Sequence, residues 1–224
     1  MDDEELELKP LNVFLSYSHK DRDIAGKIKE QLERFGFEVF LAHEDIEPLR
    51  EWQDEIISKL KNCDILIPIV SMNFRESYWT DQETGFALAR SILIIPLRID
   101  LAPYGFIGKL QALKIDDRIP DSCEKIIEIF KKSPLYEPFI DTYIRAFINS
   151  EDFYKANEMA DLLKDCERFN VKQVNEIIKG YINNSQVRGG FRAGPFVNRI
   201  FEEYSEVIDQ ELKQKYKQIL ERGY

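Results

Sequence analysis

Cysteine and histidine are scarce in this sequence, which has three cysteines and two histidines among its 224 residues. Cys63, Cys123 and Cys166 match neither the spacing of a zinc site nor an even-numbered disulfide framework. We interpret them as buried structural thiols. His19 and His43 lie apart on predicted loops, so we expect them to be solvated and expect no metal site.

Long apolar runs are missing as well. No stretch approaches the roughly 18 apolar residues that a membrane-spanning helix needs. The first ten residues, MDDEELELKP, are acidic, whereas a signal peptide begins with a basic and then an apolar segment. We therefore expect a cytoplasmic protein without a membrane span.

Basic residues are outnumbered, with 31 Lys and Arg against 41 Asp and Glu and a net charge of −10. Non-specific binding of DNA or RNA needs a basic surface, so we expect no nucleic-acid partner. A small phosphate-bearing molecule stays compatible with this charge, because backbone N–H groups can bind a phosphate.

The sequence does contain, up to about residue 132, short apolar runs that alternate with amphipathic stretches. This alternation predicts a parallel sheet of five strands flanked by helices. Pro68 fits poorly, because it lies inside an apolar run expected to be a central strand. The predicted strands are 12–17, 37–42, 64–71, 91–99 and 112–115.

Beyond Ser133 and Pro134 the strand signals stop and helical periodicity continues. We expect a first domain over 11–132 and a separate all-helical module over 135–224, which serves sensing or oligomerisation. The segment RGGFRAG (188–194) permits two interpretations, an inter-helix loop or a site for a phosphate or a partner. The predicted helices of this module are 136–149, 151–168, 171–184 and 195–221.

Several motifs of the first half occur in the order found in one family. VFLSYSHKDRDIAGKIKEQLERFGFEVFLA (13–42), HEDIEPLREWQDEI (43–56) and CDILIPIVSMNFRESYWTDQE (63–83) resemble the opening, the BB loop with its helix, and the W-x-x-x-E region of a Toll/interleukin receptor (TIR) domain. IIPLRID (94–100) resembles that family's fourth strand. The resemblance covers about residues 11–132 and is greatest to bacterial and archaeal members.

This resemblance implies a flavodoxin-like fold and, for many prokaryotic members, cleavage of NAD+ at the nicotinamide–ribose bond in antiviral defence signalling. The products are nicotinamide with linear or cyclic ADP-ribose, and both forms stay open here. NAD+ is then a substrate, and no cofactor is expected. Other family members are non-enzymatic adaptors that act through TIR–TIR assembly. Two departures from the family are Pro48-Leu49-Arg50, where many relatives have Pro-Gly, and Ala42, where some have an acidic residue.

Glu83 corresponds to the family's catalytic glutamate. The nicotinamide of NAD+ is cationic and leaves as a neutral molecule, so one carboxylate that stabilises the electron-poor ribose is sufficient. Trp79 precedes Glu83 by four residues, which places both on one helix face, and its indole suits a cationic ring. A competing interpretation is structural, because Thr80 to Glu83 also reads as a T-x-x-E capping box.

The resemblance adds Tyr17, Ser18 and Glu47 as substrate-binding residues. Backbone N–H groups near 18–21 are expected to meet the pyrophosphate. The resemblance also implies a homo-oligomer formed through the BB loop, about 42–49. Because an always-active NADase would be toxic to its own cell, we expect an activating protein or ligand that acts at the helical module. A nucleoside deoxyribosyltransferase is a weaker alternative. A two-component receiver domain is rejected, because Ser71-Met72-Asn73 stands where the phosphate-accepting aspartate would be.

Overall fold

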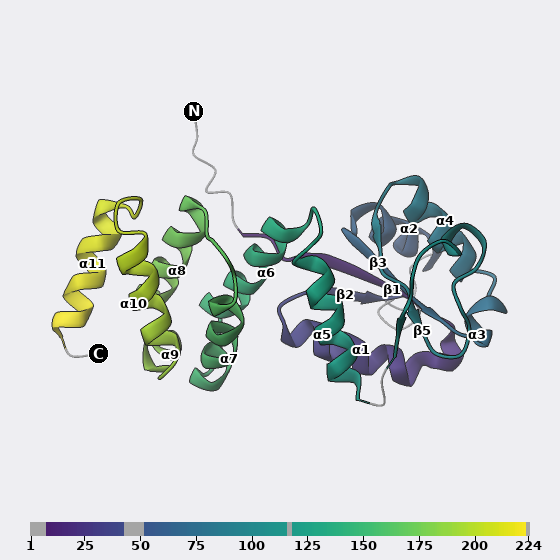
Figure 1. Ribbon diagram of the computed structural model, residues 1–224, viewed down its shortest axis with the longest axis horizontal. Helices are drawn as coiled ribbons and strands as arrows, with labels where there is room; N and C mark the ends of the chain where they lie inside the picture. Colours follow the sequence, from purple (N-terminus) through teal and green to yellow (C-terminus); the bar gives the residue numbers. More distant parts are fainter. Residues whose placement is uncertain (1–7, 43–51, 116–117, 223–224) are drawn as a thin grey trace. The chain divides into compact units, whose positions relative to one another are not determined.

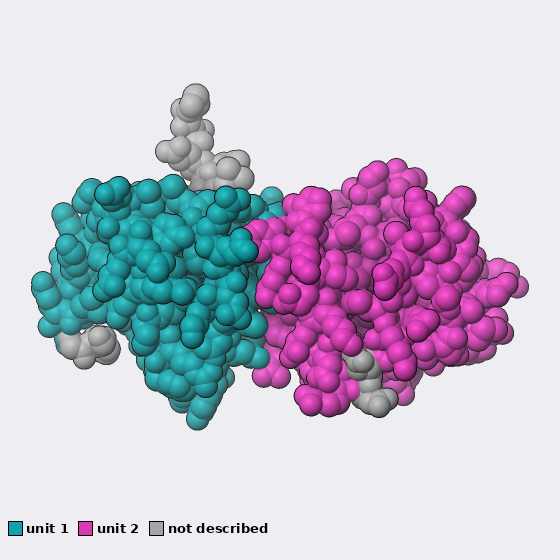
Figure 2. Space-filling model, in the orientation of Figure 1, with its two compact units in different colours: residues 1–10, 137–224 teal, residues 11–136 magenta. Residues whose placement is uncertain are grey.

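The computed structural model describes residues 8–42, 52–115 and 118–222. The chain divides into two compact units (Figure 2), one over Leu11–Tyr136 and one over Glu137–Tyr224, which also includes the described residues 8–10. The domains predicted from the sequence, a first domain over 11–132 and a helical module over 135–224, stay predictions as functional units. No helix in the described ranges is long and apolar enough to cross a membrane.

The first unit is built on a parallel sheet, which confirms the predicted fold class (Figure 1). Its strand order is β2-β1-β3-β5-β6, with β4 also paired to β3. The predicted single strand over 91–99 is instead divided into β4 and β5 on either side of Ile95 and Pro96. The strands are β1 (Asn12–Ser16), β2 (Glu38–Leu41), β3 (Ile65–Val70), β4 (Leu93–Ile94), β5 (Leu97–Arg98) and β6 (Leu113–Lys114).

The division between β4 and β5 lies opposite Pro68 of β3. The carbonyls of Leu66 and Val70 accept hydrogen bonds from the amides of Ile95 and Ile99. Because Pro68 lies midway between them, its backbone nitrogen turns toward the same neighbour, at the break between β4 and β5. The register is the same on both sides of the break, because Leu66 pairs with Ile94 and Val70 with Arg98. The break therefore lies at the hydrogen bond that Pro68, which has no N–H, cannot donate.

Helices cover both faces of the sheet (Figure 1). α2 and α4 contribute Ile56, Leu60 and Ala87 to a core with Phe14 and Leu66, whereas α1 and α5 contact each other. Every residue of β3 is buried, as expected for a strand covered on both sides. The helical segments are η1 (His19–Asp21), α1 (Arg22–Arg34), α2 (Trp52–Asn62), α3 (Met72–Arg75), α4 (Thr80–Ala89), η2 (Gly105–Ile107) and α5 (Ile119–Phe130).

The described residues of the second unit form helices and the segments that connect them, and no strand is among them. The helix predicted over 195–221 is wrong as a single element, because a turn over 204–209 separates α10 from α11. Ile208 is buried in this turn, and the Asp209 amide donates to Asn175 on α8, so α11 folds back against α8. The helices are α6 (Tyr136–Ile148), α7 (Phe153–Lys164), α8 (Val171–Asn183), α9 (Ser185–Gly189), α10 (Ala193–Glu203) and α11 (Gln210–Glu221).

Gly180 of α8 packs directly against Ile148, the last residue of α6. A Cβ atom there would lie 2.3 Å from Cγ2 and 2.6 Å from Cβ of Ile148. We expect Gly180→Ala to lower the free energy of unfolding by about 1–3 kcal/mol through overpacking. Urea denaturation measures this loss. Gly194→Ala on α10, where a Cβ meets nothing within 4 Å, is the control. Equal stability of both variants and the parent would contradict the close packing.

Candidate active site

Glu83 lies in the first turn of α4 and is only 1% exposed. Its Oε2 accepts a hydrogen bond of 2.5 Å from the hydroxyl of Ser16, the last residue of β1. Its Oε1 is also buried and has no hydrogen-bond partner within the described part of the chain. The carboxyl group is therefore anchored through one oxygen at the carboxyl end of a central strand, and the other oxygen has unused acceptor capacity.

This environment perturbs the ionisation of Glu83. Burial raises the pKa of its carboxyl group to about 7, and the hydrogen bond from Ser16 opposes that rise. A carboxyl group that titrates near neutral pH is suited to accept or release a proton during catalysis.

The capping-box interpretation of Glu83 is wrong. Helix α4 begins after Trp79, which occupies the N-cap position without a side-chain cap. Thr80 instead donates its hydroxyl to the carbonyls of Phe74 and Ser77, at 2.7 and 3.2 Å. With the hydroxyl of Thr80 and the carboxylate of Glu83 both engaged elsewhere, neither arm of the box is formed.

The other predicted site residues differ in accessibility. Trp79 is half-buried, one helical turn before Glu83, and Ser18 is nearly buried. Tyr17 is fully buried, so in this conformation its side chain belongs to the core. Glu47 and the rest of the predicted BB loop over 43–49 lie outside the described residues. The substrate-binding roles of these residues stay predictions.

Sequence reasoning missed a polar cluster between the loops that follow β1 and β3. Asp21 accepts hydrogen bonds from the Ser71 hydroxyl at 2.6 Å and from the Asn73 side-chain amide at 2.8 Å. Ser71 also caps α3 by accepting from the Phe74 amide. The sequence did contain a signal for this cluster. Its polar residues follow two strands that pair in parallel, so their carboxyl ends lie next to each other.

The cluster also bears on the expected pyrophosphate site over 18–21. The Asp21 amide already donates to the Ser18 carbonyl at 2.7 Å. The Asp21 side chain adds a carboxylate to the same loop. That amide is therefore not available to a phosphate, and Asp21 instead fixes the two loops to each other.

A cavity of about 370 Å³ lies on another side of α4 and is lined by Asp81, Thr84, Gly85 and Tyr104 among others. The Tyr104 hydroxyl donates to Asp81 at 2.8 Å across it. Glu83 does not line this cavity, because its side chain turns toward β1. Within the described residues, no cluster of three or more His, Cys, Asp or Glu side chains is arranged to hold a metal ion.

Comparison with known proteins bears on the first unit. A crystal structure of the TIR domain of the Toll-related receptor TRR-2 from Hydra magnipapillata is 23% identical, covering 57% of this chain and 96% of that chain with a TM-score of 0.42. No curated protein matches the sequence. The family described as TIR domain matches residues 13–127, about half of the chain. The chain therefore belongs to the TIR domain family.

Proposed function

We propose that this protein is an NAD+ nucleosidase that breaks the bond between nicotinamide and ribose. The observation that supports this most is Glu83, a buried carboxyl group at the carboxyl end of β1 with a pKa raised to about 7 and one oxygen not hydrogen-bonded by any described residue. The single carboxylate matches a reaction whose leaving group needs no general acid.

The chemistry proceeds in two parts. The bond between the anomeric carbon and the nicotinamide nitrogen breaks, and its electron pair stays on nicotinamide, which departs neutral. Oε1 of ionised Glu83 stabilises the positive charge that develops on the ribose. A water molecule then attacks the anomeric carbon and loses a proton to Glu83, which gives ADP-ribose. If a nucleophile within the substrate replaces water, the product is a cyclic ADP-ribose.

Trp79 supports this assignment because it lies at the start of the same helix and offers a flat, electron-rich surface for the cationic nicotinamide ring. Its partial exposure leaves part of the indole accessible to a ligand. In the proposal Ser18 and Glu47 bind the substrate, and Tyr17 does so only once the site has opened, because its side chain is fully buried in this conformation. NAD+ depletion or the released nucleotide then acts as an antiviral signal in the cytoplasm.

The test is incubation of the purified chain with NAD+, followed by chromatography for free nicotinamide. Release of nicotinamide together with linear or cyclic ADP-ribose supports the nucleosidase. The competing function is a non-enzymatic TIR assembly module. It predicts intact NAD+ even when light scattering shows that the protein has assembled.

The burial of Glu83 gives a second expectation. Because its carboxyl group is 1% exposed, the ribose reaches Oε1 only after the surroundings rearrange. We propose that self-association, which TIR domains commonly show, provides this rearrangement. The rate per molecule should then rise with protein concentration. Full turnover in a dilute sample that sediments as a monomer would contradict this expectation.

A further inference from the structure

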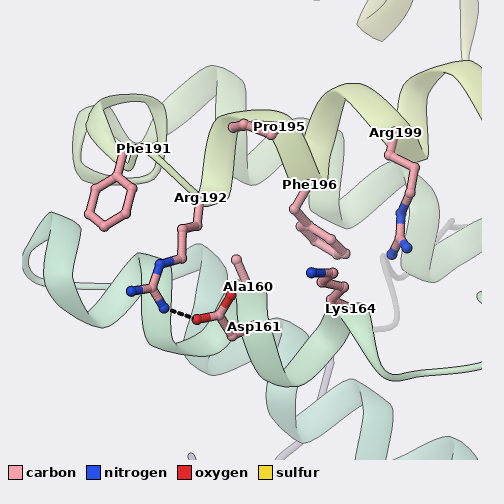
Figure 3. A pocket seen from close by; sticks show the side chains of 8 residues that line it. All are labelled: Ala160, Asp161, Lys164, Phe191, Arg192, Pro195, Phe196 and Arg199. Carbon is pink, nitrogen blue, oxygen red and sulfur yellow. Dashed lines mark hydrogen bonds and ion pairs between the residues drawn. The ribbon is translucent and has the colours of Figure 1, made fainter.

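The helical unit contains a cavity of about 300 Å³ between α7 and α10, the α7/α10 cavity (Figure 3). Its volume is at the lower end of the range of small-molecule sites, roughly 300–1,000 Å³. α7 supplies one side, and α10 with the turn before it supplies the other. The residues that matter for its chemistry are Asp161, Lys164, Phe191, Arg192, Phe196 and Arg199.

The charges around this cavity are unbalanced. Arg192 forms an ion pair with Asp161, the one acidic residue of the lining (Figure 3). Lys164 and Arg199 have no carboxylate partner among the described residues, and the Nε of Arg199 is buried without a hydrogen-bond acceptor there. In a chain of net charge −10, two unneutralised cations beside one cavity indicate a site for an anion.

Aromatic rings make up the apolar part of the same cavity. Phe196 is nearly buried, and the Arg199 guanidinium lies 5.6 Å from the centre of its ring. Lys164 lines the same cavity from α7 (Figure 3). Phe191 is 65% exposed, and the Arg192 guanidinium lies 5.1 Å from the centre of its ring. A ligand that complements both the cationic side chains and the aromatic rings of this cavity carries an anionic group and a flat ring.

The glycine-rich backbone of 188–194 does not itself form the anion site. The amides of Arg192 and Ala193 both donate to the Asn157 side chain, at 2.7 and 3.2 Å. The amides of Gly190 and Gly194 donate to the carbonyls of Val187 and Gly190. Because these four backbone donors are occupied, the side chains of Lys164 and Arg199, which have no carboxylate partner among the described residues, are the groups best placed to bind an anion.

We propose that the α7/α10 cavity binds a phosphorylated nucleoside, with the phosphate at Lys164 and Arg199 and the base against Phe196 and Phe191. The cavity volume suits a mononucleotide better than a dinucleotide. The inference goes beyond NAD+ cleavage and does not depend on it, because every residue involved belongs to the helical unit. It assigns that unit a ligand-binding role.

Isothermal titration calorimetry with adenosine monophosphate on the full chain at low salt tests the proposal. We expect saturable binding, and we expect Lys164→Met and Arg199→Gln each to weaken it by about tenfold or more, the size of loss expected for a charge-assisted contact. Lys172→Met, which removes an exposed lysine of the same unit outside the cavity, should leave the affinity within about twofold.

The titrations test the identity of the ligand and the location of the site separately. Adenosine and inorganic phosphate, titrated alone, should each bind much more weakly than the nucleotide. Phosphate binding as tight as nucleotide binding would overturn the assignment to a nucleoside. No binding of the nucleotide to the parent, or binding that Lys164→Met leaves unchanged, would overturn the site. Lys164 is exposed, so its substitution tests the site even if Arg199→Gln loses thermal stability.

Discussion

Glu83→Gln is expected to lower the rate of nicotinamide release from NAD+ by about a thousandfold or more while the chain stays folded. The neutral amide fills nearly the same space as the carboxyl group but cannot stabilise a developing positive charge. A loss of about 4 kcal/mol of transition-state stabilisation corresponds to roughly this factor in rate. The variant can still accept the Ser16 hydrogen bond through its amide oxygen.

The matched control is Glu76→Gln. Glu76 lies close in sequence and pairs with Lys20 at 3.4 Å, but both side chains are about two-thirds exposed. An exposed pair of this kind contributes little to stability, and we expect parental turnover. Nicotinamide release and the thermal midpoint should be measured for all three proteins. If folded Glu83→Gln cleaved NAD+ at the parental rate, Glu83 would not be the catalytic residue.

The sequence alone predicts an element well when all of its residues have the same environment. β3 is a continuous apolar run because both of its faces are covered, and the family motifs placed Glu83 on a helix after it. Local sequence patterns predict the structure less well where a contact with a residue distant in sequence determines a side chain's hydrogen bonds. The T-x-x-E pattern predicts a capping box, but Ser16, far away in sequence, binds the Glu83 carboxylate instead.

Two other features depended on the same kind of distant contact. Pro68 is accommodated inside β3 at the point where pairing with the neighbouring strand breaks between β4 and β5, and the local pattern around Pro68 does not identify that neighbour. The break between α10 and α11 likewise reflects the burial of Ile208 and its docking near α8 rather than any proline or glycine in 204–209. In each case the backbone follows the packing of distant residues.

The raised pKa of Glu83 predicts that activity and stability change in opposite directions with pH. Catalysis in the proposed function needs the ionised carboxylate, whose population grows as the pH rises through about 7. The kcat/KM for NAD+ should therefore fall by about tenfold per pH unit below 7, and reach about a hundredth of its plateau near pH 5.

Stability should show the reverse trend. Below the ordinary pKa of 4.5, Glu83 is protonated in both the folded and the unfolded chain. Between 4.5 and about 7 the unfolded chain releases this proton while the folded chain retains it, so the free energy of unfolding declines as the pH rises. The full loss is about 3 kcal/mol, since each pKa unit corresponds to roughly 1.4 kcal/mol. Glu83→Gln does not titrate and escapes this loss.

The difference in unfolding free energy between Glu83→Gln and the parent should accordingly move in favour of the variant from about pH 4.5 to about pH 7. It should level off near the pH at which kcat/KM reaches half of its plateau, because both limits are set by the pKa of Glu83 in the folded chain. Ser16→Ala tests the cause of the shift. It removes the hydrogen bond that lowers the pKa of Glu83 in the folded chain. The upper end of the stability change and the half-plateau of kcat/KM should therefore both move to higher pH. Urea denaturation across this range, with NAD+ kinetics in the same buffers, measures both quantities. A stability difference that stays constant with pH would show that Glu83 titrates like an ordinary exposed carboxyl group, and the proposed coupling between its burial and its chemistry would be wrong.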